Sequence, residues 1–514
     1  MESYLKVGSA SDLKGRDRVI YRCFEMLPGA LSWGTLFFVI FFSWAAPIAV
    51  SIFIIVFDIY WLLKTAYLSL HLRSSWKKLQ HHIALNWEER LTNLHWEHIW
   101  QLVILPMYEE SYEVVEGACE SLMNSSWPKD RMIVVLAIEK RAGQETAAVA
   151  DRIKEKFNSQ FAHFMITSHP DIEGELAGKG SNISWAAGKT REELIDKLNI
   201  PYENIIISAF DIDTQVYPQY FLCLAYHFLT VENPHRASFQ PVPIYNNNIW
   251  DAPALSRVVA TSGTFWQMIQ QSRPERLTTF SSHSMSFKAL CEVGYWQKNI
   301  VSEDSRIFWN SLLFFDGDYR VEPLFYPVSM DANLAPTFWK TTKNVYRQQR
   351  RWTWGVENVP YLLFGFLKNK KISFKKRLNF SLIQLEGFWS LATNPLLIFL
   401  LGWLPLMFGG DVFNTTVLSY NLPRVTRGLM TIAMTGLITS AIISTYLLPK
   451  KPEKHRKIRW LSMMIQWILV PFTITLFGAI PGLDAQTRLM FGKYMGFWVT
   501  PKHRREIEDP TQNV

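Results

Sequence analysis

The sequence predicts an α/β domain with a mainly parallel sheet, inserted between helices that cross a membrane. Short apolar runs alternate with segments of helical periodicity between Trp96 and Thr230, and long apolar stretches lie on both sides of this central region. The composition, with 48% hydrophobic, 14% aromatic and 19% charged residues, is more apolar than that of ordinary soluble proteins. Because 514 residues exceed what one hydrophobic core usually organises, we expect one large domain and additional membrane segments.

Two membrane spans are expected near the start of the chain. The stretch from Leu31 to about Leu70 contains one interior acid, Asp58, and is interrupted at Pro47. Since a helix needs about 20 apolar residues to cross a bilayer, this length suits two short spans joined by a tight turn. Basic residues flank the pair on both sides, namely Lys14, Arg16, Arg18, Arg22, Arg73, Lys77 and Lys78. Both flanks are therefore expected in the cytoplasm, and the stretch is too late and too long for a cleavable signal peptide.

Three further apolar stretches follow the central region, roughly Leu382 to Phe408, Leu429 to Leu448 and Leu461 to Ile480. Three full crossings would place the basic tail of the chain outside, against the positive-inside bias. We therefore expect one stretch to be interfacial or re-entrant, either the first, whose start is polar, or the last, which is broken at Pro471. The chain is then a multi-pass membrane protein with a cytoplasmic central domain, at the cell membrane if it is bacterial. Buried helices of a soluble protein are the alternative.

The central region contains the strands and helices of the predicted sheet. The expected strands are Ile99 to Leu105, Met132 to Ala137, Phe164 to Thr167 and Ile205 to Ala209. The expected helices are Tyr112 to Leu122 and Ala147 to Phe157. Strands that alternate with helices in this way are typical of a parallel sheet, whose ligands bind at the carboxyl ends of the strands.

Acidic residues follow three of these predicted strands. Glu110 comes after the first strand, Glu139 after the second, and Asp211 and Asp213 after Ile205 to Ala209. Together they predict a concave anionic site at one edge of the sheet, whose oxygen ligands favour Mg²⁺ or Mn²⁺ over zinc. An Asp-x-Asp pair also occurs as a solvated turn, but its position directly after a buried strand favours a metal ligand.

The net charge of +8 does not indicate nucleic-acid binding, because the basic residues cluster beside apolar stretches and no stacking module is visible. The cysteines show no paired spacing, so their pattern predicts neither a zinc site nor a disulfide framework. They are Cys23, Cys119, Cys223 and Cys291. The partners expected instead are a lipid bilayer and a small-molecule substrate, and the sequence gives no oligomeric state.

Five motifs, in order along the chain, resemble those of the membrane-bound branch of glycosyltransferase family 2, which includes cellulose, chitin and hyaluronan synthases. Pro106-x-Tyr108-x-Glu110 is similar to the opening motif of that family, and Lys179-Gly180-Ser181-Asn182 to its lysine loop. Asp211-x-Asp213 resembles the metal motif, and Ser302-Glu303-Asp304 the Thr-Glu-Asp motif. Gln348-x-x-Arg351-Trp352 is the most specific match. The resemblance spans most of residues 96–354 and implies a GT-A-type, Rossmann-like fold.

A segment near the carboxyl end resembles the Phe-x-Val-Thr-x-Lys gating loop of cellulose synthases, which covers the nucleotide site on the cytoplasmic side. Its matching residues are Phe497, Val499, Thr500 and Lys502. Two departures from the motifs of this family leave the identity of the sugar substrate open. Glu139 stands where the family usually has Asp, and Phe280 to Ser284 differs from the corresponding segment of cellulose synthases. The stretch Gln240 to Asn248 is expected to be an ordered loop near the cleft.

The resemblance implies roles for the donor-side residues. Tyr108, Glu110, Glu139 and Lys179 are expected to bind the nucleotide sugar, with Asp211 near the ribose. Asp213 is expected to hold the divalent cation that neutralises the leaving diphosphate. Arg351 is a planar donor suited to the same diphosphate, which Gln348 helps to position.

The attacking hydroxyl needs a base, and Asp304 is the candidate catalytic residue. With one base and no enzyme nucleophile, we expect single displacement, so that an α-linked UDP-sugar gives a β-linked product. Trp352 offers a flat face on which an acceptor sugar can stack, whereas Trp354 is expected in the core and the lone His283 in a structural role.

The expected organisation has four parts. Residues 1–72 hold the amino-terminal segment and two spans, 73–378 the catalytic domain, 379–482 the carboxyl-terminal helices, and 483–514 the gating-loop-like segment and tail. The leading functional hypothesis is synthesis of a β-linked polysaccharide. A non-processive transferase with a lipid acceptor is the alternative, and a non-catalytic sugar-binding membrane protein is the hypothesis from another class.

Overall fold

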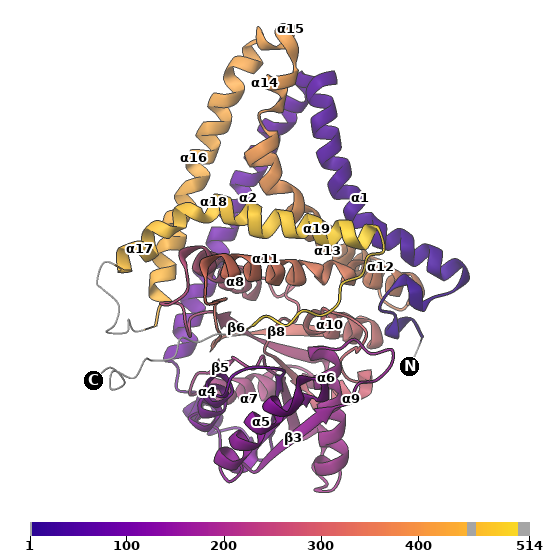
Figure 1. Cartoon of the computed structure of the whole chain (residues 1–514), viewed down its shortest axis with the longest axis vertical. Coiled ribbons are helices and arrows are strands. Elements are labelled where there is room, and N and C mark those ends of the chain that lie inside the picture. The colour runs from indigo at the N-terminus through magenta and orange to yellow at the C-terminus, as the bar shows by residue number, and fades with distance from the viewer. Residues whose placement is uncertain (1–2, 450–458, 502–514) are drawn as a thin grey trace.

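The computed structural model describes residues 3–449 and 459–501 of the chain. It has two parts, a sheet with helices on both faces and a set of long helices that extend away from it (Figure 1). The expected α/β fold is confirmed.

One mixed sheet of eight strands forms the centre of the domain, in the order β3-β2-β1-β4-β7-β6-β8-β5. The strands β3, β2, β1 and β4 run parallel, as the sequence predicts, whereas β7 is antiparallel to both β4 and β6, and β8 is parallel to β6. The strand bounds are β1 (Trp100–Met107), β2 (Met132–Glu139), β3 (His163–His169), β4 (Ile205–Ala209), β5 (Gln215–Val216), β6 (Ala237–Ile244), β7 (His283–Ser286) and β8 (Arg320–Ser329).

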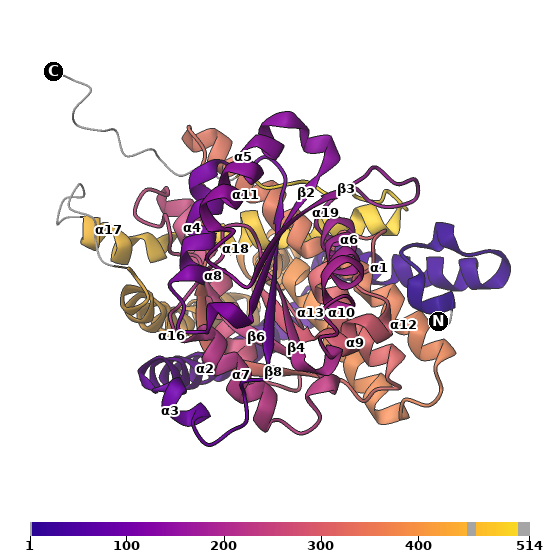
Figure 2. The ribbon, with the colours of Figure 1, turned by 90° about the horizontal axis from the view of Figure 1, so that it is seen from below.

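Both faces of the sheet are buried. Successive side chains of a strand point to opposite faces, and each face packs in its own core cluster. In β1, Val103 and Leu105 belong to one core cluster, while Leu102 and Ile104 belong to another. The first cluster includes side chains of α4 (Tyr112–Met123), α5 (Gly143–Phe157) and α7 (Tyr220–Thr230). The second includes side chains of α6 (Lys179–Thr190), α9 (Phe287–Val293) and α10 (Glu303–Phe314). Seen from below, the helices lie on both sides of the strands (Figure 2).

The expectation of a loop from Gln240 to Asn248 is wrong for its first half. Residues up to Ile244 belong to β6 and pair with β8. The two prolines in this run argued against a strand, because proline lacks the N–H of a sheet ladder. The pairing accommodates Pro241 at a register shift between Gln240 and Val242. Residues Asn246 to Asn248 follow the strand, and Asn247 donates to the carbonyl of Asp213.

Long helices from both ends of the chain lie together above the sheet in Figure 1. They are α1 (Gly15–Ala45), α2 (Pro47–Ala84), α13 (Phe374–Leu396) and α16 (Val417–Tyr446). α13 continues through the π-helical η9 (Leu397–Leu401) into α14 (Leu404–Phe408), and α15 (Gly410–Asn414) lies at the far end. The break at Pro47 is confirmed, and the helix that starts there runs to Ala84, past the expected domain boundary at residue 72.

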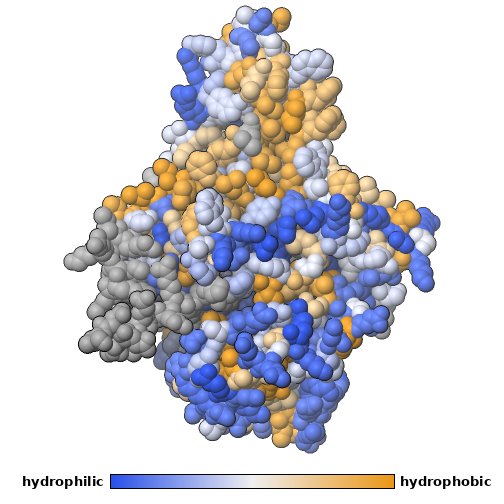
Figure 3. All heavy atoms as spheres, viewed as in Figure 1, coloured by the Kyte–Doolittle hydropathy of each residue, from blue (hydrophilic) through white to orange (hydrophobic). Residues whose placement is uncertain are grey.

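The last apolar stretch runs in a different direction from the long helices. The helices α17 (Arg459–Ile465), α18 (Val470–Ile474) and α19 (Ile480–Met490) run across the long helices, between them and the sheet (Figure 1). Side chains of α1 such as Phe37 and Trp44 are exposed, 61% and 69% respectively, and hydrophobic residues gather on one side of the upper part of the molecule in Figure 3.

Four helical segments among the described residues are long and apolar enough to cross a membrane. They are Gly15–Ala45, Pro47–Ala84, Val417–Tyr446 and Trp460–Met490. The remaining helices of the part that contains the sheet are α3 (Trp87–Leu91), α8 (Ala254–Gln271), α11 (Phe338–Thr353) and α12 (Asn358–Lys368).

Candidate active site

Three of the predicted site residues lie at the carboxyl ends of neighbouring parallel strands. Tyr108 comes directly after β1, Glu139 is the last residue of β2, and Asp211 lies two residues after β4. β1 pairs with β2 on one side and with β4 on the other. The carboxyl ends of these strands therefore meet at one edge of the sheet, where the sequence places the site.

Lys179 joins two of the predicted carboxylates at this edge. Its Nζ donates to Oδ1 of Asp211 at 2.6 Å and to both carboxylate oxygens of Asp304 at 2.9 Å. The side chain is only 8% exposed. Burial alone would lower the pKa of Lys179, but the charges of Asp211 and Asp304 outweigh burial and raise it. Lys179 is therefore a buried ammonium that stabilises negative charge on both acids.

Glu303 and Asp304 begin α10 and have different surroundings. Glu303 is buried, and the described residues provide no hydrogen-bond partner for its Oε2. Burial, and then the charge of Asp304, raise the pKa of the Glu303 carboxyl. The buried Glu303 therefore holds its proton more firmly than an ordinary glutamate, because two adjacent carboxylates do not ionise equally when one of them is buried.

His283 lies beside Asp304 but has a structural hydrogen-bonding pattern. The indole Nε1 of Trp296 donates to its Nε2 at 3.3 Å, so Nδ1 carries the proton and donates to the carbonyl of Phe280 at 3.0 Å. Burial lowers the pKa of His283, which keeps the ring neutral. Its Nδ1 lies 3.8 Å from Asp304 Oδ1. This imidazole supports the wall of the site, in agreement with the expected structural role.

Asp213 is fully buried and is held from two sides. The backbone N–H of Asp331 donates to its Oδ2 at 2.9 Å. Asn247 Nδ2 donates to the carbonyl of Asp213 at 3.0 Å and to Oδ1 of Asp331 at 2.9 Å. Asp211 accepts from Ser281 Oγ at 2.6 Å. The acids therefore offer oxygen ligands in fixed positions, and such a donor set fits Mg²⁺ or Mn²⁺.

A second polar group surrounds Tyr108. The guanidinium of Arg141 lies 4.4 Å from the centre of the Tyr108 ring and bonds Glu139 Oε2 through Nε at 2.6 Å. Glu110 Oε2 accepts from the backbone N–H of Tyr108 at 2.8 Å. Tyr108, Glu110 and Glu139 are thus brought together, with Arg141 as an additional member, into an aromatic and charged group suited to a nucleobase and ribose.

α11 carries the Gln-x-x-Arg-Trp segment. Trp352 packs against Tyr245 and Phe280, with ring centres 5.9 Å and 5.8 Å apart, and Gln348 and Trp352 line a small cavity with Tyr245. Within the described part of the chain, Nε of Arg351 is buried without a hydrogen-bond partner. This nitrogen suits an anionic oxygen of a ligand. Trp354, in contrast, is 1% exposed and belongs to the core, as expected.

The segment that resembles a gating loop lies against the same site. The guanidinium of Arg351 is 5.0 Å from the centre of the Phe497 ring. A Cβ atom on Gly178, the residue before Lys179, would lie 2.5 Å from Cγ of Phe497. Val499 is half-buried and Thr500 buried. Phe497 therefore links the lysine loop to α11, while Lys502 lies outside the described residues.

Several residues that hold the site together were not predicted from the sequence. Glu357 accepts from the backbone N–H groups of Val301 and Ser302 and from the Ser302 hydroxyl through Oε1, and from Trp354 Nε1 through Oε2. It therefore fixes the segment that precedes Asp304. Asn247, Ser281 and Asp331 are the other missed residues. The only sequence signal for Glu357 was an acid among apolar residues shortly after Trp354.

The fold and the acidic site are those of an enzyme that transfers a sugar. No curated protein matches the chain. Among solved structures, mannosyltransferase PcManGT from Pyrobaculum calidifontis, in complex with GDP-Man and Mn²⁺, is 13% identical, with 76% of this chain and 99% of that chain covered and a TM-score of 0.38. S. aureus TarS 1–349 in complex with UDP-GlcNAc is also 13% identical, with 68% and 91% covered and a TM-score of 0.32.

The family model for Glycosyl transferase family group 2 matches residues 206–477, more than half of the chain. The chain is therefore a glycosyltransferase and belongs to this family. The match begins within β4 and ends in η11 (Thr475–Ala479). It thus covers Asp211, Asp213, Asp304 and the Gln-x-x-Arg-Trp segment of α11.

Proposed function

We propose that this glycosyltransferase transfers a sugar from a UDP-sugar to the hydroxyl of a growing β-linked polysaccharide, with inversion, at the cytoplasmic face of a membrane. The observation that carries the proposal is the group formed by Lys179, Asp211 and Asp304, over which the Phe497 segment and α11 meet. Donor, base and acceptor positions are adjacent in such a site.

The donor side of the proposal uses the residues at the strand ends. Tyr108 and Arg141 contact the nucleobase, Asp211 lies near the ribose, and Arg351 binds the diphosphate. When bound at Asp213, Mg²⁺ or Mn²⁺ neutralises charge on the leaving diphosphate. Two observations support these roles. Hydrogen bonds hold the oxygens of Asp213 and Asp211 in place. The buried Nε of Arg351 has no hydrogen-bond partner among the described residues.

Asp304 is proposed to accept the proton of the attacking hydroxyl, because the Lys179 ammonium stabilises its charged form at 2.9 Å. The neutral Glu303 beside it leaves one base at this position. One base supports a single displacement, in which the acceptor oxygen bonds the anomeric carbon while the bond to the diphosphate breaks. An α-linked donor then gives a β-linked product.

The acceptor is proposed to stack on Trp352. Tyr245 and Phe280 surround this ring, and Trp352 packs against a core cluster that includes Met463 of α17. The acceptor position is therefore next to helices that join the membrane part. This closeness suits a polymer that leaves through the membrane, and it equally suits the alternative, a lipid acceptor that receives one sugar.

The membrane arrangement is also a proposal. α1, α2, the α13–α14 segment and α16 would cross, while α17 to α19 lie flat at the interface. An even number of crossings keeps the amino terminus, the catalytic domain and the last segment on one side, which we assign to the cytoplasm. The division at residues 72, 378 and 482 stays a prediction, and α2 extends past the first of these boundaries to Ala84.

The test is transfer from radiolabelled UDP-sugars by purified protein with Mg²⁺ or Mn²⁺. Asp304→Asn should lower turnover by about 100-fold or more while nucleotide binding is retained, because it removes a general base. Asp318→Asn, at an exposed acid outside the site, is the matched control. A single-sugar, organic-extractable product would replace the polymer with the lipid alternative. Unchanged function in Asp304→Asn would favour a non-catalytic sugar-binding protein.

A further inference from the structure

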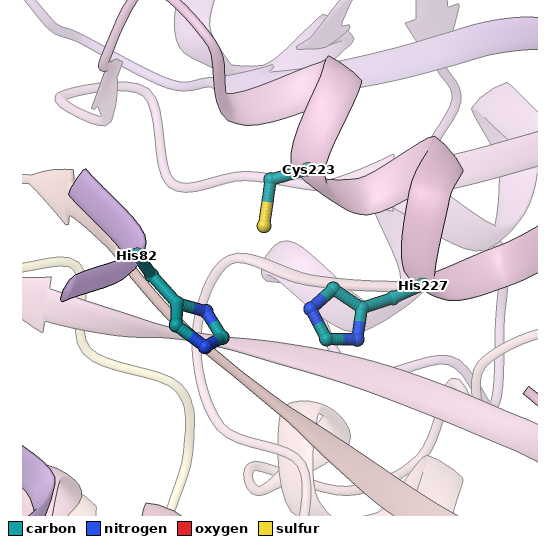
Figure 4. Close-up of side chains that lie close together, drawn as sticks. All are labelled: His82, Cys223 and His227. Atoms are coloured by element: carbon teal, nitrogen blue, oxygen red, sulfur yellow. The ribbon is translucent and has the colours of Figure 1, made fainter. Parts of the chain in front are cut away.

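A cluster of metal-binding residue types lies outside the proposed active site, where the end of α2 meets α7. His82, Cys223 and His227 turn toward a common space (Figure 4). One possible ligand atom from each lies within 4.8 Å of the others. Cys223 and His227 are one helical turn apart on α7, so they share a face, and His82 reaches them from α2. Sugar transfer at Asp304 uses none of the three.

The hydrogen bonds of the two imidazoles leave ring nitrogens able to bind a metal. Nδ1 of His82 lies 2.8 Å from the carbonyl of Leu324, which only accepts, so Nδ1 carries the proton and the other nitrogen has the lone pair. Metal-binding histidines commonly donate one ring N–H to a carbonyl in this way. Nε2 of His227 is buried and has no hydrogen-bond partner in residues 3–449 and 459–501. An orphaned buried nitrogen of this kind points to a ligand.

The surroundings hold both rings in place. The ring of Trp87 lies 5.4 Å from that of His82 and 5.7 Å from that of His227, centre to centre, and its Nε1 donates to the carbonyl of His82 at 2.8 Å. The Phe325 ring also packs against His82, with ring centres 5.7 Å apart. Cys223 is fully buried. The cluster is therefore walled by aromatic side chains, which limits exchange of a bound ion.

We propose that His82, Cys223 and His227 bind a zinc ion that joins α2 to α7. A thiolate with two neutral imidazoles is a donor set that zinc favours, unlike the all-oxygen set at Asp213. Bonds of about 2.1 Å to nitrogen and about 2.3 Å to sulfur bring ligand atoms within about 4 Å of one another, so the side chains close in by about an ångström. Binding releases the thiol proton of Cys223 to solvent, and water completes the coordination.

The proposed zinc ion would have a structural role. α2 is a candidate membrane helix, and α7 packs in the core on one face of the sheet. Zinc would therefore fasten the catalytic domain to the helix that carries it. This site could not be predicted from the sequence, because a Cys and a His four residues apart are common in helices and His82 lies far away in the chain.

The experiment uses cobalt as a spectroscopic substitute for zinc in the full-length protein in detergent. The protein is stripped with a chelator and titrated with Co²⁺. We expect one cobalt per chain with a thiolate-to-cobalt charge-transfer band, displaced by Zn²⁺ and not by Mg²⁺. Cobalt at Asp213 gives no such band, because its ligands are oxygens. Zinc loading should also raise the thermal midpoint.

Variants assign the ligands. Cys223→Ser should abolish the band, and His82→Asn and His227→Asn should weaken cobalt binding at least tenfold. Cys119→Ser, at another buried thiol, and His81→Asn, at the exposed neighbour of His82, are matched controls that should keep it. Absence of the band in the wild-type protein, its persistence in Cys223→Ser, or binding of copper without zinc would each overturn the proposal. The wild-type result needs no variant to fold.

Discussion

The buried Glu303 makes the stability of the chain depend on pH. Its pKa in the folded protein is raised by burial above the ordinary value of 4.5. The folded chain therefore keeps a proton that the unfolded chain loses above pH 4.5. The stabilisation that this proton provides is complete below that pH and is lost as pH rises through the folded-state pKa. We expect the thermal midpoint to fall over this interval, and Glu303→Gln to reduce the slope.

Glu155→Gln is the control for this prediction, because Glu155 is exposed on α5, which packs on the opposite face of the sheet from α10. It should leave the slope unchanged. An identical slope in Glu303→Gln and the wild-type protein would mean that Glu303 is ionised in the folded state.

Trp352 provides a test of the acceptor position. Trp352→Ala should raise the KM for the acceptor about tenfold, since loss of a stacking contact costs about 1.4 kcal/mol, while the KM for the donor is unchanged. Trp352→Phe should recover part of the effect. Trp339→Ala, at a 77% exposed tryptophan of the same helix, should have none. A rise in donor KM instead would place Trp352 on the nucleotide side.

Sequence reasoning found the residues that carry charge but not those that hold them. Asp211, Asp304 and Lys179 were expected from their motifs, and the structure joins them directly. Glu357 was missed because its partners are backbone N–H groups, which any sequence supplies. A side chain that binds backbone has no partner residue type from which it can be inferred.

The contact between α6 and the Phe497 segment depends on a glycine. Because a Cβ atom on Gly178 would lie 2.5 Å from Cγ of Phe497, Gly178→Ala should displace this segment. We expect faster tryptic cleavage after the exposed Lys493 and a higher donor KM. Gly188→Ala is the control, since the described residues leave open space around Gly188 in α6, the helix that follows Gly178. Equal cleavage rates in both variants would show that the segment is not packed there in solution.

At the level of elements, local patterns predicted the parallel half of the sheet well. β4 has the expected bounds, and β1 to β3 differ from theirs by at most two residues at either end. The antiparallel half was not predicted, because β7 is short and polar and β6 contains two prolines. Their place in the sheet comes from pairing with distant strands, which local propensity does not record.

The whole molecule makes a prediction about sidedness. The test uses a cysteine at the exposed Asn93, between α3 and β1, and one at the 87% exposed Val412 of α15. The sheet and α15 lie at opposite ends of the long helices (Figure 1). In a Cys23→Ser, Cys291→Ser background, an impermeant maleimide should label the two introduced cysteines from opposite sides of sealed vesicles. Labelling of both from one side would contradict the proposed crossings. Cys119 and Cys223 remain in this background, but they are buried and should stay unlabelled.

Helix α19 is bonded to three other helices at once. Asp484 accepts from Arg350 of α11 at 3.1 Å, and Gln486 bonds Ser32 of α1 at 2.7 Å and the carbonyl of Phe388 of α13 at 2.8 Å. Arg350 is the neighbour of Arg351. A displacement of α1 or α13 would therefore reach α11, and with it Arg350 and Arg351, through the hydrogen bonds of α19.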